Sequence, residues 1–315
     1  MQNIEDKAQD EKQEEDVLSP DPIQSTVLTF GVFDGVHVAH QIVIKRVVDR
    51  AKALNIDSVV ISFDPHPALS ISGKAPLVIT NTPEKIELLK KQGIDRVIVE
   101  DFNEQFAQLS PQEFVNGILV NRFHVREVVV GYDCAFGKDK IGDRWLLKEL
   151  GQEYGFGVYV VEPYRLSGVI VSSTRIRTAI LEGDLELTSK LLGRPYSISG
   201  LVVSGKGIGR EIGYATANLQ IPEQVLPPAG VYAVWVYVGE TQFDGILNMG
   251  IQPTFGGDEF RIEVHLLRFK GSLYGQKIKM SFVKKIRNEK AFAGPEELAD
   301  QIRRDEATAR KILSS

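Results

Sequence analysis

The residues best suited to chemistry are two histidines at a predicted helix start. Residues 31–40 read Gly-Val-Phe-Asp-Gly-Val-His-Val-Ala-His and follow a β-rich run at residues 26–30. His37 and His40 are three positions apart, so they would share one face at the start of the helix. A helix N-terminus that carries two imidazoles suits a polyphosphate.

The rest of that segment fits a strand-to-helix turn at which a nucleotide binds. Apolar residues recur at helical spacing between Ile42 and Ala51, which predicts an amphipathic helix. Gly31 and Gly35 let the backbone approach a ligand closely. Taken alone, the segment fits equally well an ordinary turn with surface histidines, and these residues leave that alternative open.

Three further polar clusters lie near predicted strand ends. Residues 62–67 (Ser-Phe-Asp-Pro-His-Pro) end one strand, residues 131–137 (Gly-Tyr-Asp-Cys-Ala-Phe-Gly) follow another, and residues 171–177 (Val-Ser-Ser-Thr-Arg-Ile-Arg) begin a helix. The carboxyl edge of a parallel sheet places its ligands at such points. The prolines of the first cluster are expected to hold an extended loop, which is alternatively no more than a rigid connection. The last is either an anion site, with two arginines beside helix amides, or simply a capped helix.

A second group of candidates lies after residue 200. The glycine-rich residues 205–210 (Gly-Lys-Gly-Ile-Gly-Arg) lack the spacing of a Walker loop and are weak evidence for a phosphate cradle. Thr216 and Asn218 could bind Mg²⁺ on a nucleotide through their side-chain oxygens, or belong to a turn with local caps. Glu263, between two apolar residues, is either on the solvent face of a strand or a positioned base.

The first group of candidates requires an α/β scaffold. Strands are predicted at residues 27–30, 58–63, 96–99, 127–130 and 158–161, with helices between them, for example over 82–92 and 111–121. Apolar strands separated by helices predict a parallel sheet covered on both faces. The expected architecture is a doubly wound, Rossmann-like nucleotide-binding domain.

The second group requires a β scaffold. Beyond a junction at residues 191–195, strands are predicted at residues 197–203, 230–238, 243–249, 260–269 and 277–283. Closely spaced strands without helices between them predict a small antiparallel barrel or sandwich. A helix that starts at Gly294-Pro295-Glu296-Glu297 is expected to pack on it.

Composition excludes several classes of protein. The chain has 315 residues, enough for two domains, and a net charge of −5. Residues 1–16 hold seven acids and two lysines, which accounts for all of that charge, so we expect no nucleic-acid or membrane-surface partner. Residues 1–20 are polar and are expected to be disordered.

Targeting and redox signals are also sparse. The N-terminus has no basic stretch followed by an apolar one, and no apolar run approaches bilayer length. The single cysteine, Cys134, cannot form an internal disulfide and is interpreted as a small buried residue near a strand end. We therefore expect a cytoplasmic protein.

Taken together, these segments resemble the bacterial bifunctional riboflavin kinase/FAD synthetase family. Each match is weak by itself, but the ordered set is specific and covers nearly the whole chain after residue 25. The matching residues are 31–40, 62–67, 131–137, 171–177, 191–196, 209–219, 228–234, 248–255, 263–267, 273–275 and 287–292.

The resemblance implies two sequential reactions. A C-terminal domain, residues 188–315, would phosphorylate riboflavin to FMN with ATP. An N-terminal domain, residues 21–187, would transfer AMP from a second ATP to FMN and release pyrophosphate, giving FAD. The implied partners are riboflavin, FMN, ATP and Mg²⁺, and the chain is expected to be a monomer or a weak homo-oligomer.

The resemblance also implies roles in adenylyl transfer. His37 and His40 would stabilise the charge that builds on the leaving pyrophosphate. ATP would be bound by Gly31, Phe33, Asp34, Gly35, Ser173, Thr174 and Arg177. The flavin substrate or its nucleotide would be oriented by Asp64, Pro65, His66 and Asp133.

For the kinase reaction, the resemblance makes Glu263 the base that takes the proton of the ribityl 5′-hydroxyl. Thr216 and Asn218 would hold Mg²⁺ and the phosphates. ATP would be covered by Gly205, Lys206, Gly209 and Arg210. The flavin side would be formed by Asn248, Arg287 and Phe292.

Two places depart from the family pattern. Ala39 stands where the family usually has Gly, and Tyr214-Ala215 replaces the usual Phe-Pro. We expect these changes to weaken each activity without abolishing it.

Three alternatives follow. The chain could be a riboflavin kinase with an impaired adenylyltransferase domain, which Ala39 motivates. It could be a non-catalytic flavin carrier or regulator, against which the retained Glu263, His37 and His40 argue. It could also be a nucleotidyltransferase for another phosphorylated alcohol, which the complete kinase pattern disfavours.

Overall fold

The computed structural model describes residues 23–203, 216–221, 223–254, 257–269, 271–290, 292 and 294–314. Contacts between Cα atoms divide the chain into two units, Met1–Pro76 with Thr82–Tyr164, and Leu77–Asn81 with Arg165–Ser315. The expected functional boundary between residues 187 and 188 stays a prediction. No helix within the described ranges is long and apolar enough to cross a membrane.

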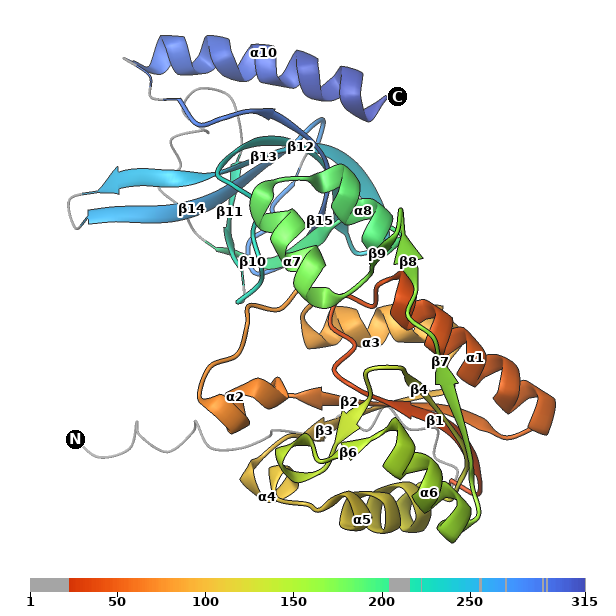
Figure 1. Ribbon diagram of the computed structural model, residues 1–315. Helices are drawn as coiled ribbons and strands as arrows, with labels where there is room; N and C mark the ends of the chain where they lie inside the picture. The colour runs from red at the N-terminus through yellow and green to blue at the C-terminus, as the bar shows by residue number, and fades with distance from the viewer. Residues whose placement is uncertain are drawn as a thin grey trace, which may run out of the picture. The chain divides into compact units, whose positions relative to one another are not determined.

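The first unit is built on a five-stranded parallel sheet (Figure 1). Its strands are β1 (Thr26–Phe30), β2 (Asp57–Asp64), β3 (Arg96–Asp101), β4 (Val125–Gly131) and β7 (Gly157–Val161), in the order β3-β2-β1-β4-β7. The strand order reverses between β1 and β4. Doubly wound sheets bind their ligands outside the carboxyl ends of the strands at this reversal.

Helices cover both faces of that sheet. They are α1 (Val38–Leu54), α2 (Pro67–Ser72), α3 (Thr82–Lys91), α4 (Glu104–Ala107), α5 (Pro111–Glu113), the π-helix η1 (Phe114–Arg122) and α6 (Arg144–Tyr154). Successive strand residues point to opposite faces. Val27 accordingly packs with α1 and α3, whereas Leu28 packs with η1 and α6. The predicted doubly wound architecture is confirmed.

Short elements complete the first unit. After β4 the chain forms a two-stranded ribbon of β5 (Ala135–Phe136) and β6 (Gly142–Asp143), with the 3₁₀ turn η2 (Lys138–Lys140) between them. This ribbon leads directly into α6.

The second unit is a closed six-stranded barrel with helices outside it. The strands are β10 (Ser197–Val203), β11 (Thr216–Gln220), β12 (Gly230–Val238), β13 (Thr241–Thr254), β14 (Gly257–Leu266) and β15 (Lys277–Arg287). The helices are α7 (Ser173–Glu182), α8 (Leu185–Leu192) and α10 (Pro295–Leu313), and β8 (Arg165–Leu166) pairs with β9 (Val169–Ile170). The predicted antiparallel barrel with a terminal helix is confirmed.

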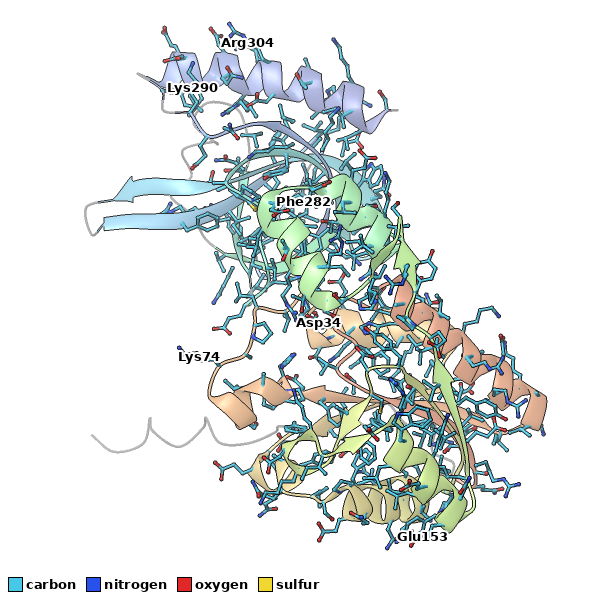
Figure 2. The ribbon with its side chains drawn as sticks, viewed as in Figure 1. Asp34, Lys74, Glu153, Phe282, Lys290 and Arg304 are labelled. Atoms are coloured by element: carbon cyan, nitrogen blue, oxygen red, sulfur yellow. The ribbon has the colours of Figure 1, made fainter. Side chains whose placement is uncertain are left out.

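Each face of the barrel wall has its own core. Phe282, labelled in Figure 2, is buried inside the barrel with its ring 5.8 Å from that of Tyr196. On the outer face, Val231, Ala233 and Ile246 pack with Ala309 of α10. The expected packing of the terminal helix on the barrel is therefore confirmed for its C-terminal half.

Two local expectations were wrong. Thr216 and Asn218 do not belong to a turn, because ladder hydrogen bonds to β10 and β14 hold them in β11. The first cluster, residues 62–67, is not an extended loop either: the chain enters α2 at Pro67, since proline is well suited to the first position of a helix.

Candidate functional site

The loop after β1 is held tightly against the end of β2. The Gly31 amide donates a hydrogen bond to the Ile61 carbonyl at 3.0 Å, and the Ser62 hydroxyl donates to the Val32 carbonyl at 3.2 Å. Asp34, labelled in Figure 2, is only 4% exposed. The loop therefore presents an ordered backbone at the carboxyl edge of the sheet.

Besides Gly31, three residues of this loop adopt positive φ angles. The values are +50° for Phe33, +86° for Gly35 and +39° for Val36. Glycine adopts this conformation freely, but for Phe33 and Val36 it is strained and must be offset by the surrounding contacts. Backbone strain of this kind concentrates at ligand-binding sites.

The two histidines form a stacked pair at the start of α1. His37 is the N-cap residue, and its Nδ1 accepts a hydrogen bond from the His40 amide at 3.3 Å. The rings lie 3.5 Å apart with an angle of 16° between their planes. Because Nδ1 of His37 is an acceptor, the proton of the neutral ring lies on Nε2.

His40 is kept neutral by its surroundings. Its Nδ1 is buried and has no hydrogen-bond partner among the described residues. Burial, and then the charges of His37 and Lys85, hold the pKa of His40 well below the usual range. At neutral pH this ring therefore contributes one N–H donor and one acceptor rather than a positive charge.

Lys85 of α3 lies at the same edge and was not a candidate in the sequence. Its side chain is 4% exposed, and its Nζ donates to the carbonyls of Val32 at 3.3 Å and Phe63 at 3.4 Å. One feature of the sequence could have identified Lys85 as buried. It lies four residues before the buried Leu89, on the apolar face of the helix. Because lysine is rarely buried without a partner, a lysine on the apolar face of a helix indicates a site that pairs its charge.

The cluster after β2 lies next to this edge. Asp64 ends β2 and is exposed, Pro65 follows it, and His66 caps α2 by accepting the Ala68 amide at Nδ1 over 3.1 Å. This cap uses the Nδ1 atom of His66 as a hydrogen-bond acceptor. The flavin-binding role of these residues stays a prediction.

The loop after β4 lies at the same carboxyl edge of the sheet, because β4 is parallel to β1 and next to it. A Cβ atom on Gly131 would lie 2.9 Å from Oδ1 of Asp133, so glycine allows this carboxylate to fold back toward the strand end. Cys134 is partly buried against the sheet core. Burial, with the charges of Asp133 and Asp143, raises the pKa of the Cys134 thiol to about 12, consistent with the structural role predicted for it.

The third cluster belongs to the second unit, whereas the histidine pair belongs to the first. Ser172 caps α7 by accepting the Arg175 amide at 3.4 Å, which leaves Ser173 and Thr174 in the first helical turn. The Arg177 Nε donates to the Leu77 carbonyl at 2.9 Å. The cap is thus confirmed, while the anion site at this cluster stays a prediction.

The kinase candidates lie side by side on three strands of the barrel. Glu263 of β14 is directly opposite Asn218 of β11 on one side and Asn248 of β13 on the other. Such opposed residues have Cβ atoms about 4.5–5.5 Å apart and share one face of the sheet. The sequence-adjacent Val264 is fully buried inside the barrel, so Glu263 is on the outer face.

The oxygen donors on this face suit Mg²⁺ carried by a nucleotide. Thr216 is opposite His265, so it shares the face of Asn218 and Glu263. No group of three His, Cys, Asp or Glu side chains within the described part of the chain could hold a metal by itself. A hydroxyl and an amide oxygen fit a Mg²⁺ that keeps waters and phosphate oxygens as its other ligands.

Of the remaining kinase candidates, Arg287 and Phe292 lie within the described residues and the glycine-rich segment does not. Arg287 forms a two-pronged ion pair with Asp305 of α10, with Nε–O distances of 3.1 and 3.0 Å, and lies 5.6 Å from the Phe292 ring centre. This pair gives Arg287 a structural role, and its flavin contact stays a prediction. Gly205, Lys206, Gly209, Arg210, Tyr214 and Ala215 lie outside the described residues.

Comparison with known proteins matches both halves of the chain to families. The FAD synthetase family model matches residues 19–175, and the riboflavin kinase family model matches residues 192–313. The bifunctional riboflavin kinase/FMN adenylyltransferase of Escherichia coli K12 is 41% identical over 298 residues, which cover 94% of this chain and 95% of that protein. The Haemophilus influenzae protein of the same name is 38% identical, covering 93% and 96%.

A solved structure has the same fold over nearly the whole chain. It is the crystal structure of a Streptococcus pneumoniae protein described as a macrolide-efflux protein. The TM-score is 0.81 at 32% identity, with 94% of this chain and 96% of that chain covered.

Proposed function

The chain belongs to the family of bifunctional riboflavin kinase/FMN adenylyltransferases, and on that premise we propose which residues carry each reaction. It is a transferase that phosphorylates riboflavin to FMN and adenylylates FMN to FAD. The observation that carries this assignment is the presence of both family models in one chain that is 41% identical to the E. coli protein over 94% of its length.

Adenylyl transfer occurs at the carboxyl edge of the parallel sheet. The FMN phosphate attacks the α-phosphorus of ATP, the bond from that phosphorus to the bridging oxygen breaks, and pyrophosphate leaves. His37 and His40 donate N–H groups to the charge that develops on the leaving group. The ordered backbone from Gly31 to Gly35, near the N-terminus of α1, favours phosphate at this position.

Other residues bind the substrates of that reaction. Ser173, Thr174 and Arg177 bind the outer phosphates of ATP, since a capped helix start with an arginine suits an anion. The flavin end is oriented by Asp64, Pro65, His66 and Asp133, which follow β2 and β4.

Riboflavin phosphorylation occurs on the outer face of the barrel. Glu263 accepts the proton of the ribityl 5′-hydroxyl while the hydroxyl oxygen attacks the γ-phosphorus of ATP. The bond from that phosphorus to the bridging oxygen breaks, and ADP leaves. Asn218 and Thr216 hold Mg²⁺, which when bound neutralises charge on the phosphates. Asn248, opposite Glu263, orients the flavin together with Arg287 and Phe292, and Arg287 also fixes the barrel edge to α10.

We also propose the cosubstrate, the domain boundary, the cellular location and the oligomeric state of the chain. Both reactions use ATP with Mg²⁺, and the functional boundary lies between residues 187 and 188. The chain works in the cytoplasm as a monomer or weak homo-oligomer, without a nucleic-acid or membrane partner.

The test is to incubate the purified chain with riboflavin, ATP and Mg²⁺ and to separate the fluorescent flavins over time. FMN should appear first and FAD second. Riboflavin that remains unchanged would contradict both activities, and would leave a flavin carrier as the explanation if riboflavin still binds.

A chain active only as a kinase is the second candidate, and Ala39 favours it. This residue is the second residue of α1 and lies between His37 and His40, where the family usually has glycine. FMN that accumulates without FAD would support this candidate. Restoration of FAD formation by Ala39→Gly would then identify the methyl group as the cause.

A further inference from the structure

Lys85 joins two strand ends at the adenylyl-transfer site. Its ammonium donates to the Val32 carbonyl, in the loop after β1, and to the Phe63 carbonyl, near the end of β2. These carbonyls come from segments 31 residues apart in the sequence. A single side chain from α3 thus fixes the loop that precedes His37 to the neighbouring strand.

The charge of Lys85 is incompletely balanced by the protein. Within the described part of the chain, its hydrogen bonds go only to these two carbonyl oxygens, at 3.3 and 3.4 Å. Both distances exceed the usual range for a strong N–H···O bond. A buried ammonium is costly unless an anion compensates it, and Asp64 and Asp34 act on it only through space.

A bound anion would compensate the positive charge of Lys85. Lys85 is 4% exposed beneath the same loop whose backbone and histidine pair suit a polyphosphate. The low dielectric of a buried site strengthens the attraction between the ammonium and phosphate charge.

We propose that Lys85 is a positioning residue for adenylyl transfer, which fixes the Val32 loop to the end of β2 and supplies positive charge beneath the phosphates of ATP. This inference rests on the proposed adenylyl transfer at this edge. It assigns a function to a residue of α3, an element that carries none of the other proposed site residues.

The charge of Lys85 gives the reaction a characteristic pH dependence. Burial lowers the pKa of the ammonium, although the charges of Asp64 and Asp34 oppose this shift. As the pH rises through that lowered pKa, the ammonium loses its proton and the charge beneath the phosphates disappears. The value of kcat/KM for ATP, which reports the free enzyme, should therefore fall on the alkaline side.

The groups that face Lys85 would not produce the same alkaline loss. They are Asp34 in the loop after β1, Asp64 at the end of β2, His40 of α1 with His37 stacked on it, and Glu84 beside Lys85 on α3. Carboxylates and imidazoles do not ordinarily titrate above about pH 8. An alkaline decrease that disappears when Lys85 becomes arginine would therefore identify the lysine.

The experiment compares Lys85→Met, Lys85→Arg and the exposed control Lys90→Met in the full chain. FAD formation from supplied FMN and FMN formation from riboflavin are measured separately across pH 6 to about 10. Lys85→Met should lower kcat/KM for ATP in FAD formation by about 10- to 100-fold. Its kinase activity, and both activities of Lys90→Met, should match the wild type.

Lys85→Arg should restore most of the FAD-forming activity and extend it to higher pH, because a guanidinium keeps its charge there. Equal FAD formation by Lys85→Met and the wild type, or identical alkaline profiles for the wild type and Lys85→Arg, would overturn the inference. The second comparison remains informative even if Lys85→Met fails to fold. A wild-type chain that makes no FAD would instead overturn the proposed function on which the inference rests.

Discussion

The two units position their chemical groups in opposite ways. In the parallel-sheet unit, the histidine pair and the loop after β1 lie beyond the strand ends, and hydrogen bonds from Gly31 to Ile61 and from Ser62 to Val32 hold that loop to the neighbouring strand β2. In the barrel, Glu263 lies within a strand whose ladder pairs it with Asn218 and Asn248 on both sides. Loop backbone suits phosphate recognition, whereas strand interiors suit the fixed placement of side chains.

This difference predicts how each site responds to substitution. A side chain on the outer face of the barrel can be replaced without disturbing the ladder, so the loss there should be almost purely chemical. The sheet site depends on a strained loop and on a helix cap, so its residues contribute to both local structure and chemistry.

The largest expected effect is that of Glu263→Gln. The amide keeps the size of the side chain but cannot accept the proton, so FMN formation from riboflavin should fall by about 10²- to 10⁴-fold. FAD formation from supplied FMN should be unchanged. The two rates are measured by separating the flavins, and a Glu263→Gln chain with normal kinase activity would remove the base from the proposed mechanism.

His37→Asn is the matching test in the sheet unit. Asparagine is a favoured N-cap residue, so the start of α1 should be preserved while the imidazole is lost. FAD formation should decrease by about 10²-fold or more, as expected for loss of a donor to developing charge. Kinase activity is the internal control, and unchanged FAD formation would show that the histidine only caps the helix.

Asp305→Ala tests stability in the barrel unit. It leaves Arg287 without its carboxylate partner, and Arg287 is only 22% exposed. The free energy of unfolding of this unit should fall by about 2–4 kcal/mol. The chain has two tryptophans, of which Trp235 lies in β12 and Trp145 in α6, so urea unfolding can be followed by Trp235 fluorescence in a Trp145→Phe background. A midpoint equal to that of the Trp145→Phe parent would show that the ion pair contributes nothing.

The smallest effect concerns His40 and pH. Below about pH 6.5 an unfolded histidine binds a proton, whereas the lowered pKa keeps the folded His40 neutral. The unfolded state then binds more protons, so the free energy of unfolding of the sheet unit should fall as pH decreases, by at most about 1.4 kcal/mol per pH unit from this group.

Trp145 fluorescence in a Trp235→Phe background reports the unfolding of the sheet unit. The decrease in stability between pH 6.5 and about 5.5 should be smaller in His40→Gln than in its parent. An equal decrease in both would show that His40 is protonated as readily in the folded protein as in the unfolded chain.

Much of this architecture is predictable from the sequence because local patterns determine it. The run of β-branched residues before Gly31 and the helical spacing after it predict β1 and α1, and both are confirmed. The composition change after α8 likewise predicts the barrel. β11 was missed because Thr-Ala-Asn-Leu-Gln has no strong apolar alternation, and its strand conformation comes from pairing with β10 and β14.

The site was less predictable where long-range packing decides the environment. A lysine in a predicted helix is ordinarily solvated, so its place on the apolar face is a weak signal, and the packing of α3 against the sheet is needed to establish that Lys85 is buried. Arg287 and Asp305 are 18 residues apart and lie on different elements. Their pairing depends on where α10 docks, which sequence spacing does not specify.

The most direct test of the central claim, that the histidine pair and Glu263 serve two independent reactions, is a mixing experiment with Glu263→Gln and His37→Asn. Alone, the first variant should make FAD from FMN but not from riboflavin, and the second should convert riboflavin to FMN and stop. A mixture of the two should convert riboflavin to FAD, because FMN released by one chain can be adenylylated by the other. Loss of both activities in either single variant, or a mixture that stops at FMN, would contradict the account.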